Sequence, residues 1–221
     1  MRSFDEIFEI AAGRHGGAGE LEKKLSKPLT AEQLAAKTDD RWLAGMTKSI
    51  FQAGFNWKVI ENKWQGFEAA FDGFDIQACA YRLPDSFDAL TQDKRIVRNP
   101  QKIATVQVNA LFIEAIAAEH SGFGRWIAEW PRSDYVGLVD ELGKRGSRLG
   151  GATAQYFLRF AGVDGFILSR DVVARLIAER VIDRQPTSLK ARRAAQEAFN
   201  HWAEESGRSL TEISRTLGFS I

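Results

Sequence analysis

Apolar residues recur at three- and four-residue spacing along almost the whole chain, and this pattern constrains the fold more than any other feature. It is clear between residues 138 and 142 and again between residues 172 and 177. The strict alternation that marks a half-buried strand is hardly present. Because a period near 3.6 places apolar side chains on one face of a helix, we expect an all-α fold.

Local signals mark where several of these helices begin and end. Thr30 with Gln33, and Ser209 with Glu212, have the spacing of a capping box, in which two side chains satisfy free amides at a helix start. Glycines stand where helices end, at positions 54, 73, 146 and 162. We therefore expect helices joined by short loops.

The 221 residues, 44% of them hydrophobic, suffice for one domain or for two closely packed helical lobes. We expect an N-terminal helical segment at 1–40, a core at 41–185 and a C-terminal helical extension at 186–221. Pro186 and Ser188 mark the start of that extension.

Overall composition excludes several classes of protein. The formal charge of +1 gives no global field for a polyanion, so any nucleic-acid surface must come from local clustering. A single cysteine, Cys79, excludes an intrachain disulfide and a multi-cysteine zinc site. Without a signal peptide or a long apolar run, we expect a soluble, cytoplasmic monomer that does not contact a membrane.

One stretch, RGSRLGGATAQYFLR at residues 145 to 159, combines small residues with arginines and contains no acid. Residues 135–145 are predicted to form one helix, residues 147–151 a tight turn, and residues 152–161 a second helix that ends at Gly162. The segment 135–161 is therefore predicted to be a helix-hairpin-helix.

This hairpin has the features of a DNA-phosphate site. Gly150 and Gly151 permit positive φ, so amides of the turn and of the next helix can point at an anion. Lys144, Arg145 and Arg148 give the turn a local positive field. The alternative is a close helix crossing with solvated arginines around it.

Three ordered segments resemble the bacterial DNA-3-methyladenine glycosylase I family, a branch of the helix-hairpin-helix DNA glycosylases. They are FQAGFNWKVIENKWQGFEAAFDGFD at 51–75, RIVRNPQKIATVQVNA at 95–110, and LGKRGSRLGGATAQYFLRFAGVD at 142–164. The resemblance implies an all-α enzyme that flips a damaged base into a pocket and hydrolyses its N-glycosidic bond.

Three residues are expected to contact the flipped base, the first of them from the resemblance. Trp57 matches the family's pocket tryptophan, although a lone tryptophan is more often part of a core. Ser49 stands where the family has a glutamate, which removes the usual carboxylate contact to the base. Ser49 and Gln52, one helical turn apart, are expected to bond the base edge.

Asp171 is the candidate catalytic carboxylate. Related glycosylases outside this branch use an aspartate shortly after the hairpin, and RDVVAR at 170–175 is similar to that pattern. Alternatively, Asp171 is a helix-start residue favoured by the helix dipole, or a partner of Arg175 four residues on. Many family members bind zinc through two Cys and two His, but Asp171 and Arg175 stand where the second pair would be. We expect no metal and no cofactor.

The sequence thus predicts a monofunctional DNA glycosylase of base-excision repair that acts on 3-methyladenine-like alkylated purines in double-stranded DNA. It is expected to be monofunctional because strand cleavage needs an amine near the sugar, and no lysine lies between Lys144 and Lys190. The alternative is a catalytically inactive protein that binds DNA lesions through the hairpin.

Overall fold

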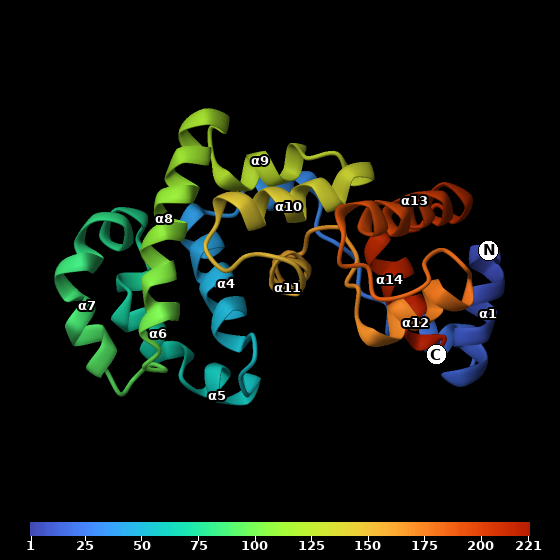
Figure 1. Ribbon diagram of the computed structural model, residues 1–221, viewed down its shortest axis with the longest axis horizontal. Helices are drawn as coiled ribbons and strands as arrows, with labels where there is room; N and C mark the ends of the chain where they lie inside the picture. Colours follow the sequence, from blue (N-terminus) through green and yellow to red (C-terminus); the bar gives the residue numbers. More distant parts are fainter. The chain divides into compact units, whose positions relative to one another are not determined.

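A computed structural model describes the whole chain, residues 1–221, and every regular element in it is helical. The expectation of an all-α fold is confirmed. No helix combines the length and the apolar character needed to cross a bilayer. The chain forms two compact units, each assembled from separate stretches of sequence (Figure 1). Unit 1 contains residues 1–29, 130–138 and 162–221, and unit 2 contains residues 30–129 and 139–161.

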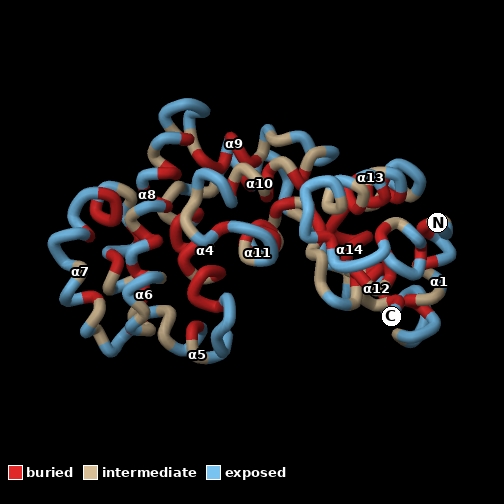
Figure 2. The backbone as a smooth tube through the Cα atoms, viewed as in Figure 1, coloured by how far each residue is buried: buried red, intermediate tan, exposed pale blue.

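Unit 2 is built around two long helices, α4 (Asp39–Gln52) and α8 (Pro100–His120), which lie side by side (Figure 1). Most of α4 is buried, as Figure 2 shows. Its shorter helices are α3 (Ala31–Ala35), α5 (Trp57–Asn62), α6 (Trp64–Ala70), α7 (Leu83–Gln92) and α9 (Phe123–Glu129). A 3-10 turn at Asp72–Phe74 and a π-helical turn at Ala78–Arg82 connect α6 to α7.

Aromatic side chains make up much of the unit 2 core. Trp42 on α4 is fully buried and packs against Phe123 at 5.6 Å and Phe157 at 5.9 Å between ring centroids. Phe51, near the end of α4, packs edge-on against Phe67 of α6 at 4.7 Å. Because such rings bury large apolar areas, these contacts fix α4 as the rigid centre of the unit.

The predicted helix-hairpin-helix is present. Its helices are α10 (Tyr135–Arg145) and α11 (Ala152–Ala161), with the bounds that the sequence predicted. The first turn of α10 belongs to unit 1, while the rest of α10, the connecting turn and α11 belong to unit 2. Gly162 follows α11 with a φ of 91°, a value that favours glycine.

Unit 1 contains α1 (Phe4–Arg14), α2 (Ala18–Glu22), α12 (Arg170–Ala178), α13 (Leu189–Ser206) and α14 (Leu210–Phe219). Helix α14 packs against α1, α12 and α13. The core includes a stacked pair, Phe166 and Phe199, whose ring centroids are 4.2 Å apart. Both predicted capping boxes are confirmed, at Thr30 in unit 2 and at Ser209 in unit 1.

Candidate functional site

A cavity of about 440 Å³ lies in unit 2 between α4, α5 and α11. This volume falls within the range of roughly 300 to 1,000 Å³ that is typical of small-molecule sites. Its lining residues are Lys37, Arg41, Gly45, Lys48, Ser49, Gln52, Trp57, Glu61, Phe157, Phe160 and Ala161. All of them belong to the same unit.

One face of α4 forms the floor of this cavity. Five of its residues follow three- and four-residue spacing and therefore share a face: Arg41, Gly45, Lys48, Ser49 and Gln52. Ser49 and Gln52 are only 6% and 5% exposed, so the two predicted base-binding residues are together in the cavity wall. At Gly45, a Cβ would lie 3.3 Å from the Phe157 ring, so this glycine lets α11 approach α4 closely.

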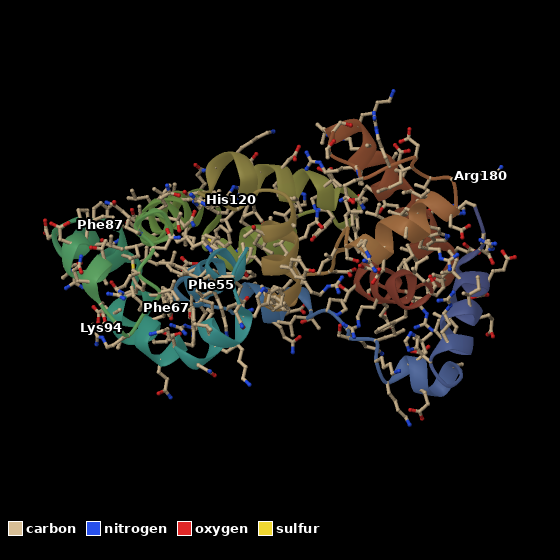
Figure 3. All side chains as sticks on the ribbon, turned by 60° about the horizontal axis from the view of Figure 1, so that its bottom comes forward. Phe55, Phe67, Phe87, Lys94, His120 and Arg180 are labelled. Carbon is tan, nitrogen blue, oxygen red and sulfur yellow. The ribbon has the colours of Figure 1, made fainter.

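Trp57 forms an aromatic wall of the cavity. It is the first residue of α5, a helix that Asn56 caps by accepting a hydrogen bond from the Lys58 amide. Its indole is 43% exposed and meets Tyr156 and Phe160 edge-on, at 5.5 and 5.6 Å. Trp57 is therefore not an ordinary core residue, and that alternative is wrong. The preceding Phe55 is exposed as well (Figure 3).

Glu61 supplies the only carboxylate in the cavity lining. It lies four residues after Trp57 on α5, so both side chains share a face of that helix. The Lys48 ammonium lies 2.7 Å from one Glu61 oxygen, and the Gln52 amide donates to the other at 3.1 Å. Sequence reasoning missed Glu61, because its place in the site depends on its contacts with Lys48 and Gln52 of α4.

Two further cations line the cavity. Arg41 forms ion pairs with Asp40 and Glu68 at 2.7 and 2.9 Å, and these partners hold the pKa of its guanidinium above the ordinary value. Lys37 donates to the Ala161 carbonyl at 2.7 Å, and its ammonium lies 4.8 Å from the Trp42 ring centroid. Burial lowers the pKa of Lys37, because desolvation disfavours the charged form.

The hairpin turn is held in place from α8. The Asn109 side chain is fully buried, accepts from the Ser147 amide at 2.7 Å and donates to the Ser147 carbonyl at 3.2 Å. Of the two glycines that permit positive φ, Gly151 uses it, with a φ of 55°, and Gly150 does not. Arg148 is the other left-handed residue of the turn, with a φ of 56°.

The surface of the turn is open. Arg148, Gly150 and Gly151 are all exposed. The first amides of α11, which follow directly, have no partners within their own helix. Since α11 rises by about 1.5 Å per residue, its start at the turn and its end at the cavity are separated by roughly 15 Å.

The three basic residues predicted on the hairpin have different surroundings. Lys144 is exposed. Arg145 lies 3.6 Å from Glu119 and 3.7 Å from Glu141, which neutralise much of its charge. Arg148 donates to the Gln101 side chain at 2.6 Å and has no carboxylate partner. The positive field at the turn therefore comes mainly from Lys144 and Arg148.

Lys102 supports the end of α4 that borders the cavity. From the first turn of α8 it donates to the carbonyls of Phe51 and Ala53 at 3.2 and 2.8 Å, at the C-terminus of α4. Burial lowers the pKa of Lys102, and the Arg148 charge lowers it further. A cation at this helix end is favoured by the dipole, so Lys102 stabilises the turn of α4 that carries Gln52.

Asp171 lies in unit 1, in the first turn of α12, where Ser169 is the N-cap residue. Its carboxylate side chain is 51% exposed and lies 3.5 Å from the Arg170 guanidinium. Asp171 thus lies at a helix start, a position that the catalytic role and the alternative of a dipole-favoured residue have in common. The pairing with Arg175 is wrong, because Arg175 is buried against Glu179 at 3.2 Å and donates to Ser220 at 2.7 Å.

No group of three or more His, Cys, Asp or Glu residues lies close enough to share a metal ion.

Cys79 is buried and lines a second cavity of about 200 Å³ in unit 2. Burial raises the pKa of its thiol to about 12, with a smaller contribution from Asp75 and Asp72. The thiol is therefore protonated at neutral pH and is a poor ligand or nucleophile.

Comparisons with known proteins give a family match for part of the chain and similar folds. Residues 34–138 match the methyladenine glycosylase family; the hairpin turn and α11 lie beyond that match. The chain is similar in fold to a crystal structure of 3-methyladenine DNA glycosylase I, with a TM-score of 0.50 and 22% identity over 62% of this chain and 82% of that one. An 8-oxoguanine glycosylase/lyase of Methanocaldococcus jannaschii, in complex with 15mer DNA, matches with a TM-score of 0.48 and 16% identity over 96% and 95% of the two chains.

Proposed function

We propose that the chain is a DNA glycosylase that excises alkylated purines, because residues 34–138 match the methyladenine glycosylase family. The observation that carries the proposal is the cavity beside Trp57, which has Ser49 and Gln52 in its wall. A flipped purine would stack on the exposed indole, while the two polar side chains bond its edge. The exposed hairpin turn belongs to the same unit.

In this proposal the hairpin holds the DNA backbone. The amides around Gly151 and at the start of α11 point at a phosphate, and Lys144 and Arg148 add charge-assisted contacts. Such contacts position the protein without reading the sequence, as suits an enzyme that must act on lesions in any context. Helix α11 then relates the phosphate site at its start to the cavity at its end.

The reaction is hydrolysis of the N-glycosidic bond. The bond between C1′ and the base nitrogen breaks, the base keeps the electron pair, and a water oxygen bonds to C1′. We assign to Asp171 the task of stabilising the cationic sugar and taking the proton from that water. The exposure of the Asp171 carboxylate supports this role, because its one ion-pair partner, Arg170, is itself exposed and leaves the carboxylate accessible to a sugar and a water.

Release of free base tests the proposal. Alkylated duplex DNA is incubated with the protein, and released bases are separated by chromatography. We expect release by the wild type, a loss of about 10- to 100-fold in Trp57→Ala, because base stacking is worth roughly 1–3 kcal/mol, and a loss of about 100-fold or more in Asp171→Asn. Unchanged circular dichroism would show that both variants fold, and full activity of Trp57→Ala would contradict the proposal.

One observation favours a second function, binding of DNA lesions without catalysis. The only carboxylate in the cavity lining, Glu61, is bound by Lys48 and Gln52, and Ser49 stands where the family has a glutamate. A protein of this kind would bind alkylated duplexes more tightly than unmodified ones and release no base. Measured affinity with no detectable release would establish this second function and refute the first.

A further inference from the structure

The charges in the cavity lining do not cancel. Three cations, Lys37, Arg41 and Lys48, face one carboxylate, Glu61. Lys48 is paired with Glu61 at 2.7 Å. Arg41 is paired with Asp40 and Glu68, the latter through both guanidinium nitrogens, at 2.9 and 3.0 Å. Lys37 has no carboxylate partner and so leaves the cavity with an uncompensated positive charge.

The Lys37 ammonium is held in one place. It donates a hydrogen bond to the Ala161 carbonyl at 2.7 Å and lies 4.8 Å from the Trp42 ring centroid. An ammonium group has three hydrogens to donate, and this carbonyl uses one of them. Since Lys37 lines the cavity, its other hydrogens are free for an acceptor on a bound molecule.

The aromatic faces nearest these cations are already occupied. The Lys37 ammonium lies over Trp42, and the Lys48 ammonium lies 4.9 Å from the Trp64 ring centroid. A cationic base gains most from an open indole face with carboxylates nearby. In this cavity it would meet Trp57 and a fixed ammonium, and the one carboxylate there is already paired.

We propose that Lys37 selects the base by charge, so that the cavity accepts an uncharged purine lesion with a carbonyl or ring-nitrogen acceptor and disfavours a cationic alkylpurine. The inference rests on the proposed function and narrows its substrate class. A cationic base would place two like charges in a partly desolvated cavity, where screening by water is weak. An uncharged base with an acceptor instead receives a charge-assisted hydrogen bond from the ammonium. As the C1′–N bond breaks, that ammonium gives its proton to the departing base, which therefore leaves neutral, while the proton of the attacking water goes to Asp171.

Two kinds of lesion separate these outcomes. Duplexes carrying O6-methylguanine or 1,N6-ethenoadenine present uncharged bases, and duplexes carrying N7-methylguanine present a cationic one. We expect the wild type to release at least one uncharged base at least tenfold faster than N7-methylguanine, measured as kcat/KM. Faster release of N7-methylguanine than of both uncharged bases would overturn the inference and leave the glycosylase activity established.

Variants of Lys37 show whether this side chain makes the selection. Lys37→Met is expected to lower at least tenfold the ratio of kcat/KM for the uncharged bases to kcat/KM for N7-methylguanine. Lys37→Arg keeps the charge and should lower this ratio less. Lys37→Gln repeats the test if the methionine variant does not fold. The matched control, Lys94→Met, removes an exposed lysine of the same unit (Figure 3) and should leave the ratio unchanged.

The pattern across substrates separates the remaining explanations. If Lys37→Met slows every substrate by the same factor, Lys37 contacts a DNA phosphate and does not select the base, which overturns the inference. The proposed function fails if none of these duplexes loses its base and if DNA methylated at many positions releases no base either. The two failures are therefore distinguishable.

Discussion

Arg148 adopts a backbone conformation that residues with a Cβ rarely take. Its φ of 56° lies in the left-handed region, which costs roughly 1 kcal/mol for a residue other than glycine. The other left-handed residue of this turn is a glycine, Gly151. An arginine kept in a strained position is consistent with selection for its charge over the stability of the fold.

The strain and the charge can be separated by two substitutions. Arg148→Gly and Arg148→Ala both remove the guanidinium, but only glycine relieves the strain. We expect Arg148→Gly to be more stable than Arg148→Ala by about 1 kcal/mol in urea denaturation. Both variants should lower the slope of log affinity for DNA against log salt by about one, because one phosphate contact is lost. An unchanged slope would remove Arg148 from the DNA interface.

Lys37 gives stability a pH dependence with a definite sign. Burial lowers its pKa below the ordinary value of 10.5. Between the lowered value and 10.5 the unfolded chain binds a proton that the folded chain has released, so the free energy of unfolding rises with pH in that window. Lys37→Met removes this dependence.

We therefore expect any stability gain of Lys37→Met over the wild type to be greatest near pH 7 and to shrink as the pH approaches 10.5. Urea denaturation of both proteins at several pH values measures it. The same comparison with Lys94→Met, which removes an exposed lysine, should give a difference that does not vary with pH. A constant difference for Lys37→Met would show that its ammonium is not desolvated by the fold.

At the scale of single residues, sequence reasoning identified three members of the cavity lining and missed the rest. Trp57 was predicted from a resemblance carried by local motifs, and Ser49 and Gln52 from their spacing of one helical turn. Lys37 and Glu61 were not, because their importance depends on partners elsewhere in the chain or on the cavity itself. An isolated lysine or glutamate has no local pattern that distinguishes it from a solvated surface residue.

The hairpin turn depends on a single buried side chain of another element. Asn109 of α8 makes both of its hydrogen bonds to the backbone of Ser147. Asn109→Ala leaves the part-buried amide and carbonyl of Ser147 without these partners, so we expect a loss of about 1 to 3 kcal/mol in the free energy of unfolding. DNA affinity should fall with it, since the turn loses its support.

The neighbouring residue of α8 provides the control. Val108 is 45% exposed, and Val108→Ala should change stability by no more than about 0.5 kcal/mol. If Asn109→Ala were as mild as this control in chemical denaturation, the turn would not depend on Asn109.

Among the elements, those with strong local signals were predicted best. Helices α10 and α11 have the predicted bounds because glycines and a tight turn interrupt the apolar spacing between them. The periodicity of α4 likewise indicates which of its residues share a face. It does not indicate that this face borders a cavity, because that depends on how α5 and α11 pack around it, including the close approach at Gly45.

At the scale of the whole molecule, the two units are discontinuous in sequence. Residues 1–29, 130–138 and 162–221 form one of them, so the chain passes between units several times. Linear cues such as Pro131 and Pro186 mark interruptions between helices, but they do not reveal which distant segments pack together. That information lies in contacts such as the one between α1 and α14, which join the two ends of the chain.

The enzyme is expected to be monofunctional even though two lysines, Lys37 and Lys48, line the cavity. Lys48 is paired with Glu61. Burial lowers the pKa of Lys37, which makes it the candidate amine, but its nitrogen is held at 2.7 Å from the Ala161 carbonyl. Borohydride added during turnover should trap no covalent protein–DNA adduct. An adduct that appears with the wild type and disappears in Lys37→Met or Lys48→Met would show lyase chemistry instead.

The most direct measurement of the central claim is whether a base binds beside Trp57. In ¹⁵N-labelled protein, the indole signal of Trp57 is assigned by its absence in Trp57→Phe, and free 1,N6-ethenoadenine is then titrated. The Trp57 signal should shift in a saturable manner, while that of Trp202, which is buried in the core of unit 1, stays in place. The account would be contradicted if the protein releases bases from DNA and yet none of those free bases shifts the Trp57 signal.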